Sequence, residues 1–325
     1  MINSKIRKAT GEQSGLLVIT GPTATGKSAL GIRLAKVIDG EIVSADSMQV
    51  YMHMDIGTAT PSIGDMCGIP HHLISFIPPQ EDYSVARYVS DASSCVDDII
   101  RRGKVPILVG GSGLYIDSLI KGRCFSARGN AVLRRKLERE YDIIGGKAML
   151  MKLREVDIET AERLFENDKK RIVRALEIFK TTGKPVSIHD KETKALPDRY
   201  DAVKIALTFS NRHDLYSGIN SRVDDMISGG LIQEVQSLLD MGVSRGNTSM
   251  QAIGYKELSA ILPGNVDDGK LNEAVEKIKA ESRRYAKRQL TWLRRDVDVR
   301  WIIREVSPDF DGDVKKITEI LDEKK

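Results

Sequence analysis

The fold is decided by the stretch Leu16-Leu17-Val18-Ile19-Thr20-Gly21-Pro22-Thr23-Ala24-Thr25-Gly26-Lys27-Ser28. Its first part is a short apolar run, which predicts a buried strand, and residues 29–35 continue with the apolar spacing of a helix. Between the two, residues 21–28 match the pattern G-x-x-x-x-G-K-[ST], in which backbone N–H groups and a helix N-terminus converge on phosphate groups. The sequence therefore predicts a phosphate loop between a strand and a helix.

The residue types in this loop suit a ligand with a diphosphate or triphosphate group. Lys27 would bring positive charge to the phosphate oxygens, and the hydroxyl of Ser28 is placed to bind Mg²⁺, which prefers oxygen ligands. A chance match in a tight turn is the alternative, and the flanking strand and helix patterns argue against it. The loop, typical of nucleotide-binding and ATP-binding proteins, identifies the ligand class but not the reaction.

Length and composition indicate an ordinary globular protein. The chain has 325 residues, 41% of them hydrophobic and 30% charged, which is enough for one large domain with an elaboration, or two domains. Its net charge of +4 is only mildly basic. Cys67, Cys95 and Cys124 stand far apart, as in proteins of a reducing compartment, and no apolar run is long enough to span a membrane. We expect a cytoplasmic monomer.

Residues 40–46 predict a second strand that ends in an acid, Asp46. In an open parallel sheet the carboxyl end of such a strand faces the ligand crevice. Asp46 could therefore act beside the phosphate loop as a general base or an outer-shell magnesium partner. It could equally be the N-cap of the next segment, and these residues alone do not decide between the two.

The next segments predict loops and a further strand with its crossover. Residues 47–61 indicate a functional loop with a short helical start, because Gly57 and Pro61 oppose a long helix. Cys67, His71 and His72 suggest zinc, but the absence of a fourth ligand at a familiar spacing favours a structural or substrate-facing histidine pair. An amphipathic helix is expected over 84–102, a buried strand over 105–109 and a helix over 114–120.

The strand over 105–109 lacks a feature of ATP-hydrolysing enzymes. Such enzymes usually carry an acid at this strand end to hold Mg²⁺. Here Val109 is followed by glycine, which argues against motor and hydrolase functions.

The second half of the chain predicts a helical insertion and a return to the core. The core is expected over 14–125 and 199–310, the insertion over 126–198, and tails over 1–13 and 311–325. A strand is expected over 203–209, one helix over 215–239 and a polar connection over 248–255.

Basic residues gather at two places in this half. The first is the helical pattern 168–179 in the insertion, where exposed cations could contact phosphates or simply be solvated. The second is residues 279–295, which hold seven basic residues and one acid, Glu281, together with Tyr285 and Trp292. Uniform charge with aromatic residues is typical of contact with a nucleic-acid backbone, although a role within the protein is the alternative.

Taken together, these motifs resemble the tRNA dimethylallyltransferases, also called tRNA isopentenyltransferases. The matching segments occur in the family's order over most of the chain: 21–28, 44–51, 54–59, 70–73, 110–115, 174–177 and 285–292. Three positions depart from the usual pattern. Met48 and Thr60 stand where many members have basic residues, and Ser112 replaces a frequent threonine.

The resemblance implies an α/β fold, namely a phosphate-loop NTPase-like parallel sheet core with a helical insertion domain. It also implies transfer of a dimethylallyl group from dimethylallyl diphosphate to N6 of the adenosine just 3′ of a tRNA anticodon, with Mg²⁺ as cofactor and the anticodon stem-loop as partner. Asp46 would be the general base and Thr23 would help to position the amine or the diphosphate. The loop would then hold a leaving group and not ATP.

The resemblance further implies two sets of binding residues. Those for the diphosphate are Gly21, Pro22, Thr23, Ala24, Thr25, Gly26, Lys27, Ser28 and Arg222, with Ser28 as the metal ligand. Those for tRNA are Asp46, Ser47, Met48, Gln49, Ser112, Lys170, Arg171, Ile172, Val173, Arg174, Met250, Gln251, Ala252, Ile253, Gly254, Tyr255, Arg283, Arg284, Lys287, Arg288 and Gln289.

Two other classes of protein explain part of the sequence. A small-molecule kinase accounts for the phosphate loop but not for the basic helix. A non-catalytic RNA-binding protein accounts for the helix but not for a phosphate loop joined to Asp46.

Overall fold

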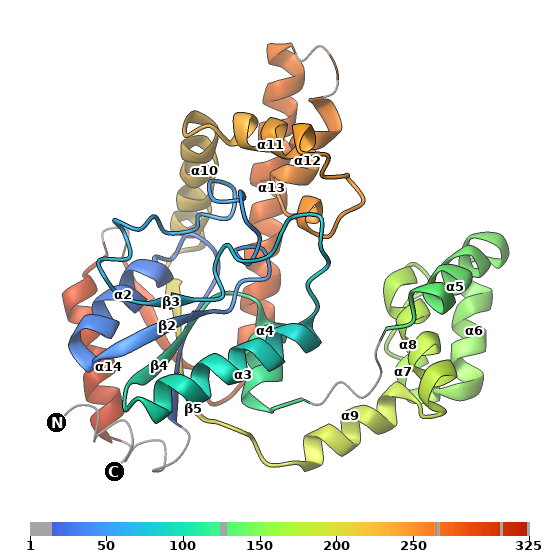
Figure 1. Ribbon diagram of the computed structural model, residues 1–325, viewed down its shortest axis with the longest axis horizontal. Helices are drawn as coiled ribbons and strands as arrows, with labels where there is room; N and C mark the ends of the chain where they lie inside the picture. The colour runs from blue at the N-terminus through green and yellow to red at the C-terminus, as the bar shows by residue number, and fades with distance from the viewer. Residues whose placement is uncertain (1–14, 124–128, 263, 265–266, 306–307, 324–325) are drawn as a thin grey trace. The chain divides into compact units, whose positions relative to one another are not determined.

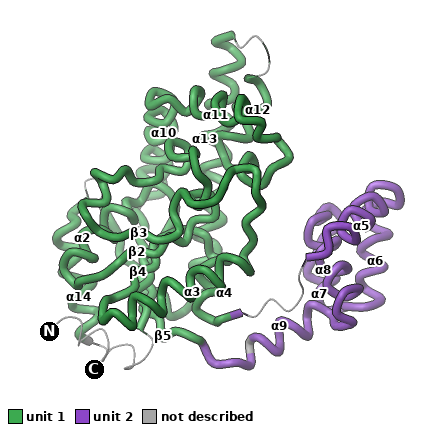
Figure 2. Tube along the Cα trace, viewed as in Figure 1, with its two compact units in different colours: residues 1–122, 199–325 green, residues 123–198 purple. Residues whose placement is uncertain are grey.

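The computed structural model describes residues 15–123, 129–262, 264, 267–305 and 308–323. The contacts between residues divide the chain into two compact units, coloured separately in Figure 2. Unit 1 comprises residues 1–122 and 199–325, and unit 2 comprises residues 123–198. The predicted insertion, 126–198, begins three residues after the start of unit 2 and ends at the same residue. The predicted tail 1–13 and Cys124 lie outside the described residues.

Unit 1 is built on a six-stranded sheet with the strand order β3-β2-β4-β1-β5-β6. Four of its strands, β2, β3, β4 and β5, are labelled in Figure 1. Every neighbouring pair is parallel, which confirms the predicted α/β core with a parallel sheet. Residues 16–19 of the central strand are fully buried, as expected where helices cover both faces of a parallel sheet. The strands are β1 (Gly15–Thr20), β2 (Gly40–Ser44), β3 (His71–His72), β4 (Val105–Val109), β5 (Asp201–Phe209) and β6 (Arg300–Arg304).

Two helices cover one face of this sheet. The helices α2 (Lys27–Ile38) and α14 (Phe310–Glu323) share a core with alternate residues of the strands, among them Ile205 and Leu207 of β5. Ala206 lies between these two residues and packs with Leu293 at the end of α13 (Asp268–Leu293). Because successive strand residues point to opposite faces, the end of α13 covers the other face.

The remaining helices of unit 1 complete its layers. The predicted amphipathic helix over 84–102 is confirmed as α3 (Val85–Arg101), whose N-cap Ser84 accepts a hydrogen bond from the N–H of Arg87, and α3 packs against β2 and β4. The others are α4 (Gly113–Ile120), α10 (Arg212–Ser228), α11 (Leu231–Asp240), α12 (Tyr255–Ile261) and a 3₁₀ turn over Ser249–Gln251.

Unit 2 is helical over its described residues. It contains α5 (Ala131–Ile144), α6 (Gly146–Val156), α7 (Ile158–Ala161), α8 (Lys169–Thr182) and α9 (Val186–Ala195). Its own core joins α5, α6, α7 and α8 through buried residues such as Leu137, Leu153 and Leu176. Glu177 is buried beside this core and accepts hydrogen bonds from the N–H of Asn130 and the guanidinium of Arg134, so it ties α8 to α5.

Three sequence predictions in unit 1 are wrong. The single helix over 215–239 is two helices, because the chain turns at Gly229-Gly230, where Gly230 has a φ of 101° that side-chain-bearing residues rarely adopt. The segment after Asp46 begins with turns and not with a helix. Residues 311–323 are not a tail, because they belong to α14, whose Ile317 and Leu321 are buried in the core.

Over the described part of the chain, no helix is both long and apolar enough to span a membrane.

Candidate active site

The phosphate loop follows β1 and leads directly into α2, as its sequence predicts. Gly26 forms the N-cap of α2 with a left-handed φ of 77°. The carbonyl oxygen of Pro22 accepts hydrogen bonds from Thr25 Oγ1, at 2.9 Å, and from Lys27 Nζ, at 2.7 Å. The loop is thereby closed by its own side chains, with the N-terminus of α2 at its end.

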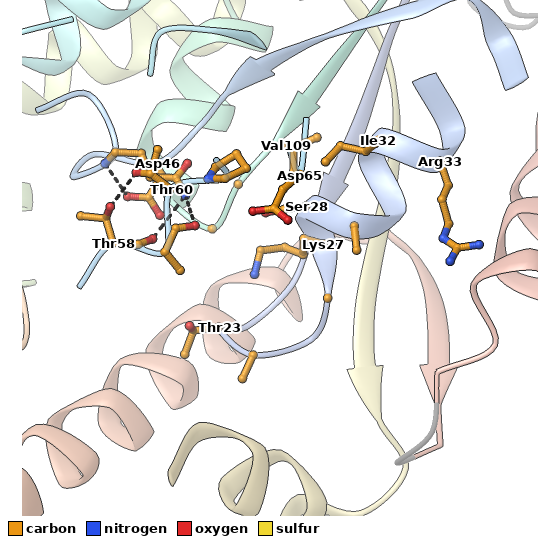
Figure 3. Close-up of a pocket in the computed structure, with 18 of the residues that line it drawn as sticks. Thr23, Lys27, Ser28, Ile32, Arg33, Asp46, Thr58, Thr60, Asp65 and Val109 are labelled. Carbon is orange, nitrogen blue, oxygen red and sulfur yellow. Dashed lines mark hydrogen bonds between the residues drawn. The ribbon is translucent and has the colours of Figure 1, made fainter. Parts of the chain in front are cut away.

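A cavity of about 1010 Å³ lies over this loop (Figure 3). Thr23, Lys27 and Ser28 line it from the loop and from the first turn of α2, and Asp46 lines it from the segment after β2. The predicted placement of Asp46 at the carboxyl end of its strand is confirmed, since β2 ends at Ser44. The structure therefore brings the loop cation, a hydroxyl and a carboxylate to one cavity.

A second cavity, of about 290 Å³, adjoins the first. The two cavities share five lining residues, namely Thr23, Asp46, Thr58, Arg222 and Tyr285. The second cavity extends past apolar side chains of α10, such as Ile219 and Val223, to Arg288 of α13. Asp46 and Thr23 thus stand where two cavities meet, so a molecule in each could contact them at once.

Asp46 uses one carboxylate oxygen to shape its own turn. Oδ1 accepts hydrogen bonds from the N–H of Met48, at 2.9 Å, and of Gln49, at 3.4 Å. This is the capping geometry that one of the two sequence interpretations expected, although it caps a turn. Because these bonds use only Oδ1, they orient the carboxylate and leave Oδ2 outside the cap. The capping and catalytic interpretations are therefore compatible.

Two cations approach the loop from different elements. Burial, and then the neighbouring guanidinium of Arg222, lower the pKa of Lys27 to about 7, while Asp46 acts in the opposite sense. Burial also lowers the pKa of Arg222, and Asp46 again opposes the shift. Burying like charges together is unfavourable unless an anion joins them. The arrangement is therefore suited to an anionic ligand such as a diphosphate.

Gln289 links α13 to the phosphate loop. It is buried, its Oε1 accepts a hydrogen bond from the N–H of Thr23 at 3.0 Å, and its Nε2 donates to Gly111 O at 3.0 Å. Its prediction as a tRNA contact is therefore corrected, because both ends of its amide are engaged within the protein. Gln289 holds Thr23 in place from a position 266 residues further along the chain.

Glu234 of α11 anchors the loop that forms another wall of both cavities. Its carboxylate accepts hydrogen bonds from the N–H groups of Asp55, Ile56 and Gly57 at 2.8 to 3.2 Å, and from the hydroxyl of Tyr255 at 2.5 Å. The next residues of this loop, Thr58 and Ala59, accept hydrogen bonds from Gln49 Nε2. Sequence patterns do not single out Glu234, because it reads as an ordinary helix residue.

The predicted tRNA contacts fall into exposed and buried groups. Lys170, Arg171, Arg284, Lys287 and Arg288 are exposed, as contact with phosphates requires. In contrast, the side chains of Ile172, Val173, Met250 and Tyr255 are almost fully buried, so these residues could contact tRNA only through their backbone. Their apolar or aromatic groups belong to the protein interior.

The other predicted tRNA contacts have partners or line the cavities. Arg174 pairs with Glu177 at 2.9 Å, and Arg283 donates to Asn220 of α10 at 2.5 Å. Ser112 Oγ accepts from the N–H of Ser47 at 3.1 Å, which fixes the segment after Asp46. The second cavity is also lined by Ser47, Met48, Gln251, Ala252, Ile253 and Gly254.

The two histidines of β3 have partners within the protein. His71 Nδ1 lies 2.8 Å from Ile69 O, and His72 Nε2 lies 2.9 Å from Glu41 Oε2. Arg102 also donates to both oxygens of Glu41, and these bonds lower the pKa of Glu41 to about 2. The pair is part of a structural cluster.

The chain is similar to proteins of known families and structures. The family model described as IPP transferase matches residues 49–296. A tRNA dimethylallyltransferase of Caldanaerobacter subterraneus is 46% identical over 288 residues, covering 88% of this chain and 90% of that protein. One from Acetivibrio thermocellus is 45% identical, with 93% and 95% coverage.

Solved structures give the same result. The tRNA isopentenylpyrophosphate transferase of Bacillus halodurans matches with a TM-score of 0.69 and 41% identity, over 95% of this chain and 97% of that one. A eukaryotic dimethylallyltransferase, described as acting on tRNA, matches with a TM-score of 0.74 and 31% identity, over 86% of this chain and 69% of that one.

Proposed function

Because this chain belongs to the tRNA dimethylallyltransferase family, we propose that it transfers the dimethylallyl group of dimethylallyl diphosphate to N6 of the adenosine just 3′ of a tRNA anticodon. The observation that carries the proposal is the meeting of the two cavities at Thr23 and Asp46. One cavity lies over the phosphate loop and would hold the donor. The other extends to the basic helix and would hold the acceptor base.

In the proposed reaction, the adenine amine attacks the first carbon of the dimethylallyl group as the bond from that carbon to the diphosphate oxygen breaks. The amine proton passes to the Asp46 carboxylate, and the diphosphate leaves into the phosphate loop. Backbone N–H groups and Lys27 stabilise the charge that develops on the leaving group. Thr23, held by Gln289, is placed to orient the amine or the diphosphate.

The acceptor base must leave its stack to react. Adenine in a folded anticodon loop is accessible only when it is unstacked, and proteins reach bases in single-stranded loops by such extrusion. Tyr285 and Arg288 line the second cavity, and the guanidinium of Arg288 lies 5.6 Å from the ring centre of Tyr285. We propose that this pair borders the entrance for the extruded base.

We propose that Mg²⁺ accompanies the diphosphate, with Ser28 as a protein ligand. Ser28 is exposed at the first turn of α2 and lines the donor cavity. Among the described residues there is no cluster of three or more His, Cys, Asp or Glu side chains that could hold a metal alone. The residues therefore fit a cation that takes most of its ligands from substrate phosphates and water, as Mg²⁺ commonly does. When bound, Mg²⁺ would neutralise charge on the leaving diphosphate.

The proposal is tested by incubating the protein with labelled dimethylallyl diphosphate, Mg²⁺ and unmodified tRNA that carries the target adenosine. We expect label in the tRNA, and none in a control tRNA with guanosine at that position. A parallel reaction with ATP should release no phosphate, because β4 ends at Val109 without an acid. Phosphate release from ATP without tRNA, together with unlabelled tRNA, would favour the kinase alternative.

We further propose that the protein acts as a monomer in the cytoplasm. The support is that Thr23, Lys27 and Asp46, the groups proposed for catalysis and diphosphate binding, meet at one cavity within a single chain, so the proposed reaction requires no residue of a second copy. Size-exclusion chromatography with light scattering should give the mass of one chain, 36.1 kDa.

A further inference from the structure

The last strand and the last helix of the chain meet behind the phosphate loop. Arg304 ends β6 and Asp313 lies in the first turn of α14, and both side chains are at least 94% buried. Arg304 Nε and Nη2 each lie 2.7 Å from Asp313 Oδ2. The ring of Phe310 packs 4.7 Å from the guanidinium. These contacts fix the orientation of the buried Arg304 guanidinium.

The free end of that guanidinium reaches the phosphate loop. Arg304 Nη1 donates a hydrogen bond to Thr25 O at 2.5 Å. In a trans peptide unit the C=O and the following N–H point in opposite directions. Fixing the carbonyl of Thr25 therefore also fixes the direction of the Gly26 N–H. Gly26 is the left-handed N-cap of α2, so its N–H is one of the groups that a phosphate at the helix N-terminus would meet.

The two sides of this peptide unit face different cavities. Arg304 lines a separate cavity of about 440 Å³ together with Ala24, Thr25 and Gly26. Ala24 and Gly26 also line the large cavity over the loop, and Arg304 does not. The loop therefore lies between the two cavities. Arg304 contacts the loop from the side of the smaller cavity, so a ligand in the large cavity would not touch Arg304.

We propose that Arg304 is a positioning residue that holds the phosphate loop in its diphosphate-binding conformation, with Asp313 fixing its direction. The inference rests on the proposed diphosphate site and adds to it a residue that no sequence pattern singles out. Arg304 also lies outside the region 49–296 that the family model matches. The strand β6 and the helix α14 thereby contribute to ligand binding through Arg304 and Asp313, in addition to their places in the core of unit 1.

The test removes the ion pair without leaving a buried charge. In the double variant Arg304→Met with Asp313→Leu, both ions are replaced by apolar side chains, a change that folded proteins commonly tolerate. Thr25 O then loses its donor. The dissociation constant for inorganic diphosphate should rise roughly tenfold, as expected when one hydrogen bond that orders a binding group is lost. The dissociation constant for unmodified tRNA and the thermal unfolding midpoint should stay unchanged.

A second variant covers the case in which the double variant does not fold. Arg304→Lys keeps the charge, but a single ammonium group cannot reproduce the fork that reaches both Asp313 and Thr25. It should weaken diphosphate binding in the same direction, again without changing tRNA binding. The matched control is Lys204→Met with Asp296→Leu, which removes a less buried ion pair, of 2.6 Å, between β5 and the segment before β6. Its diphosphate affinity should equal that of the parent.

The outcomes separate this inference from the function on which it rests. If the parent binds inorganic diphosphate and both Arg304 variants bind it equally well, the positioning role is overturned and the proposed function stands. If diphosphate and tRNA affinity fall by the same factor, Arg304 is only structural and the inference again fails. If the parent itself binds neither inorganic diphosphate nor dimethylallyl diphosphate, the proposed donor site is overturned.

Discussion

Lys27 carries its ammonium group into a position at the start of α2 where burial and Arg222 lower its pKa to about 7. The pattern of the loop predicts a lysine that faces phosphate, but its pKa depends on a neighbour far away in the sequence, Arg222. Such a pairing comes from the fold and not from a local pattern. Without a bound anion, the lowered pKa means that part of the Lys27 side chains are neutral near pH 7. A bound anion would favour the charged form again.

We therefore expect diphosphate binding above pH 7 to be accompanied by proton uptake at Lys27. The bound anion raises the lysine pKa again, so a proton must be taken up wherever the free protein has lost it. The charged form of Lys27 contributes fully to diphosphate affinity below about pH 7, and this contribution declines as the pH rises above the lysine pKa. Calorimetry in buffers of different ionisation enthalpy measures the uptake at pH 8.

The matched control is Lys27→Arg, which stays charged throughout this range. Its proton uptake reports the ionisation of the diphosphate alone, and the parent should exceed it. Equal uptake in the parent and the variant would show that Lys27 is already protonated in the free protein.

Among the helices, α13 uses one set of residues for contacts within the protein and another set for the proposed contact with tRNA. Lys279 pairs with Asp224 at 2.8 Å and Arg283 with Asn220, both on α10, while Gln289 holds the phosphate loop. Arg284, Lys287 and Arg288 are exposed. From the sequence, phosphate contact and an internal role are alternatives for this helix. Charge and spacing could not assign them residue by residue, because the assignment depends on where α10 lies.

Replacing Arg284 and Arg288 together by alanine should weaken binding to modifiable and non-modifiable tRNAs alike. Contacts with phosphates carry no sequence information, and each one lost should reduce the salt dependence of binding. Filter binding at several salt concentrations measures both quantities. The control is Arg294→Ala with Arg295→Ala, which removes the same charge from exposed positions just past the end of this helix. If the two double variants behave identically, the effect is one of total charge and not of a site.

Other elements show where local patterns stop being informative. The helix α3 has an apolar residue at every third or fourth position and a serine cap, so its sequence predicts its bounds almost to the residue. In contrast, β6 carries charged residues at both ends of a five-residue segment, and only pairing with β5 makes it a strand. The helix α14 comes after it and is amphipathic, yet its burial depends on the core formed by strands far earlier in the chain.

At the scale of the whole molecule, the predicted parts and the unpredicted contacts have different physical origins. The phosphate loop and the alternation of strands and helices are local, so the sequence alone indicates a parallel sheet. The bond between Gln289 and Thr23 spans 266 residues, and that between Arg304 and Thr25 spans 279. Such contacts exist only once β5, β6 and α13 are in place. The resemblance to the family therefore assigns Gln289 to tRNA without showing its bond to Thr23, and no sequence pattern singles out Arg304.

The proposed function requires that the reaction occur where the two cavities meet at Asp46. The most direct test is single-turnover transfer from dimethylallyl diphosphate to unmodified tRNA, with the parent and Asp46→Asn compared at equal diphosphate saturation. The amide keeps the shape of the side chain and its cap but cannot accept the proton. The rate should fall by roughly 10²- to 10⁴-fold, the usual contribution of a positioned general base. Diphosphate affinity, measured on the same preparation, should change little.

Two results would contradict a general-base role for Asp46. Transfer at the parent rate would mean that Asp46 only caps its turn and that another group takes the proton. Loss of diphosphate binding in parallel with activity would mean that the carboxylate acts chiefly through the metal. If Asp46 is the general base, the Asn variant shows a slow rate with intact diphosphate binding.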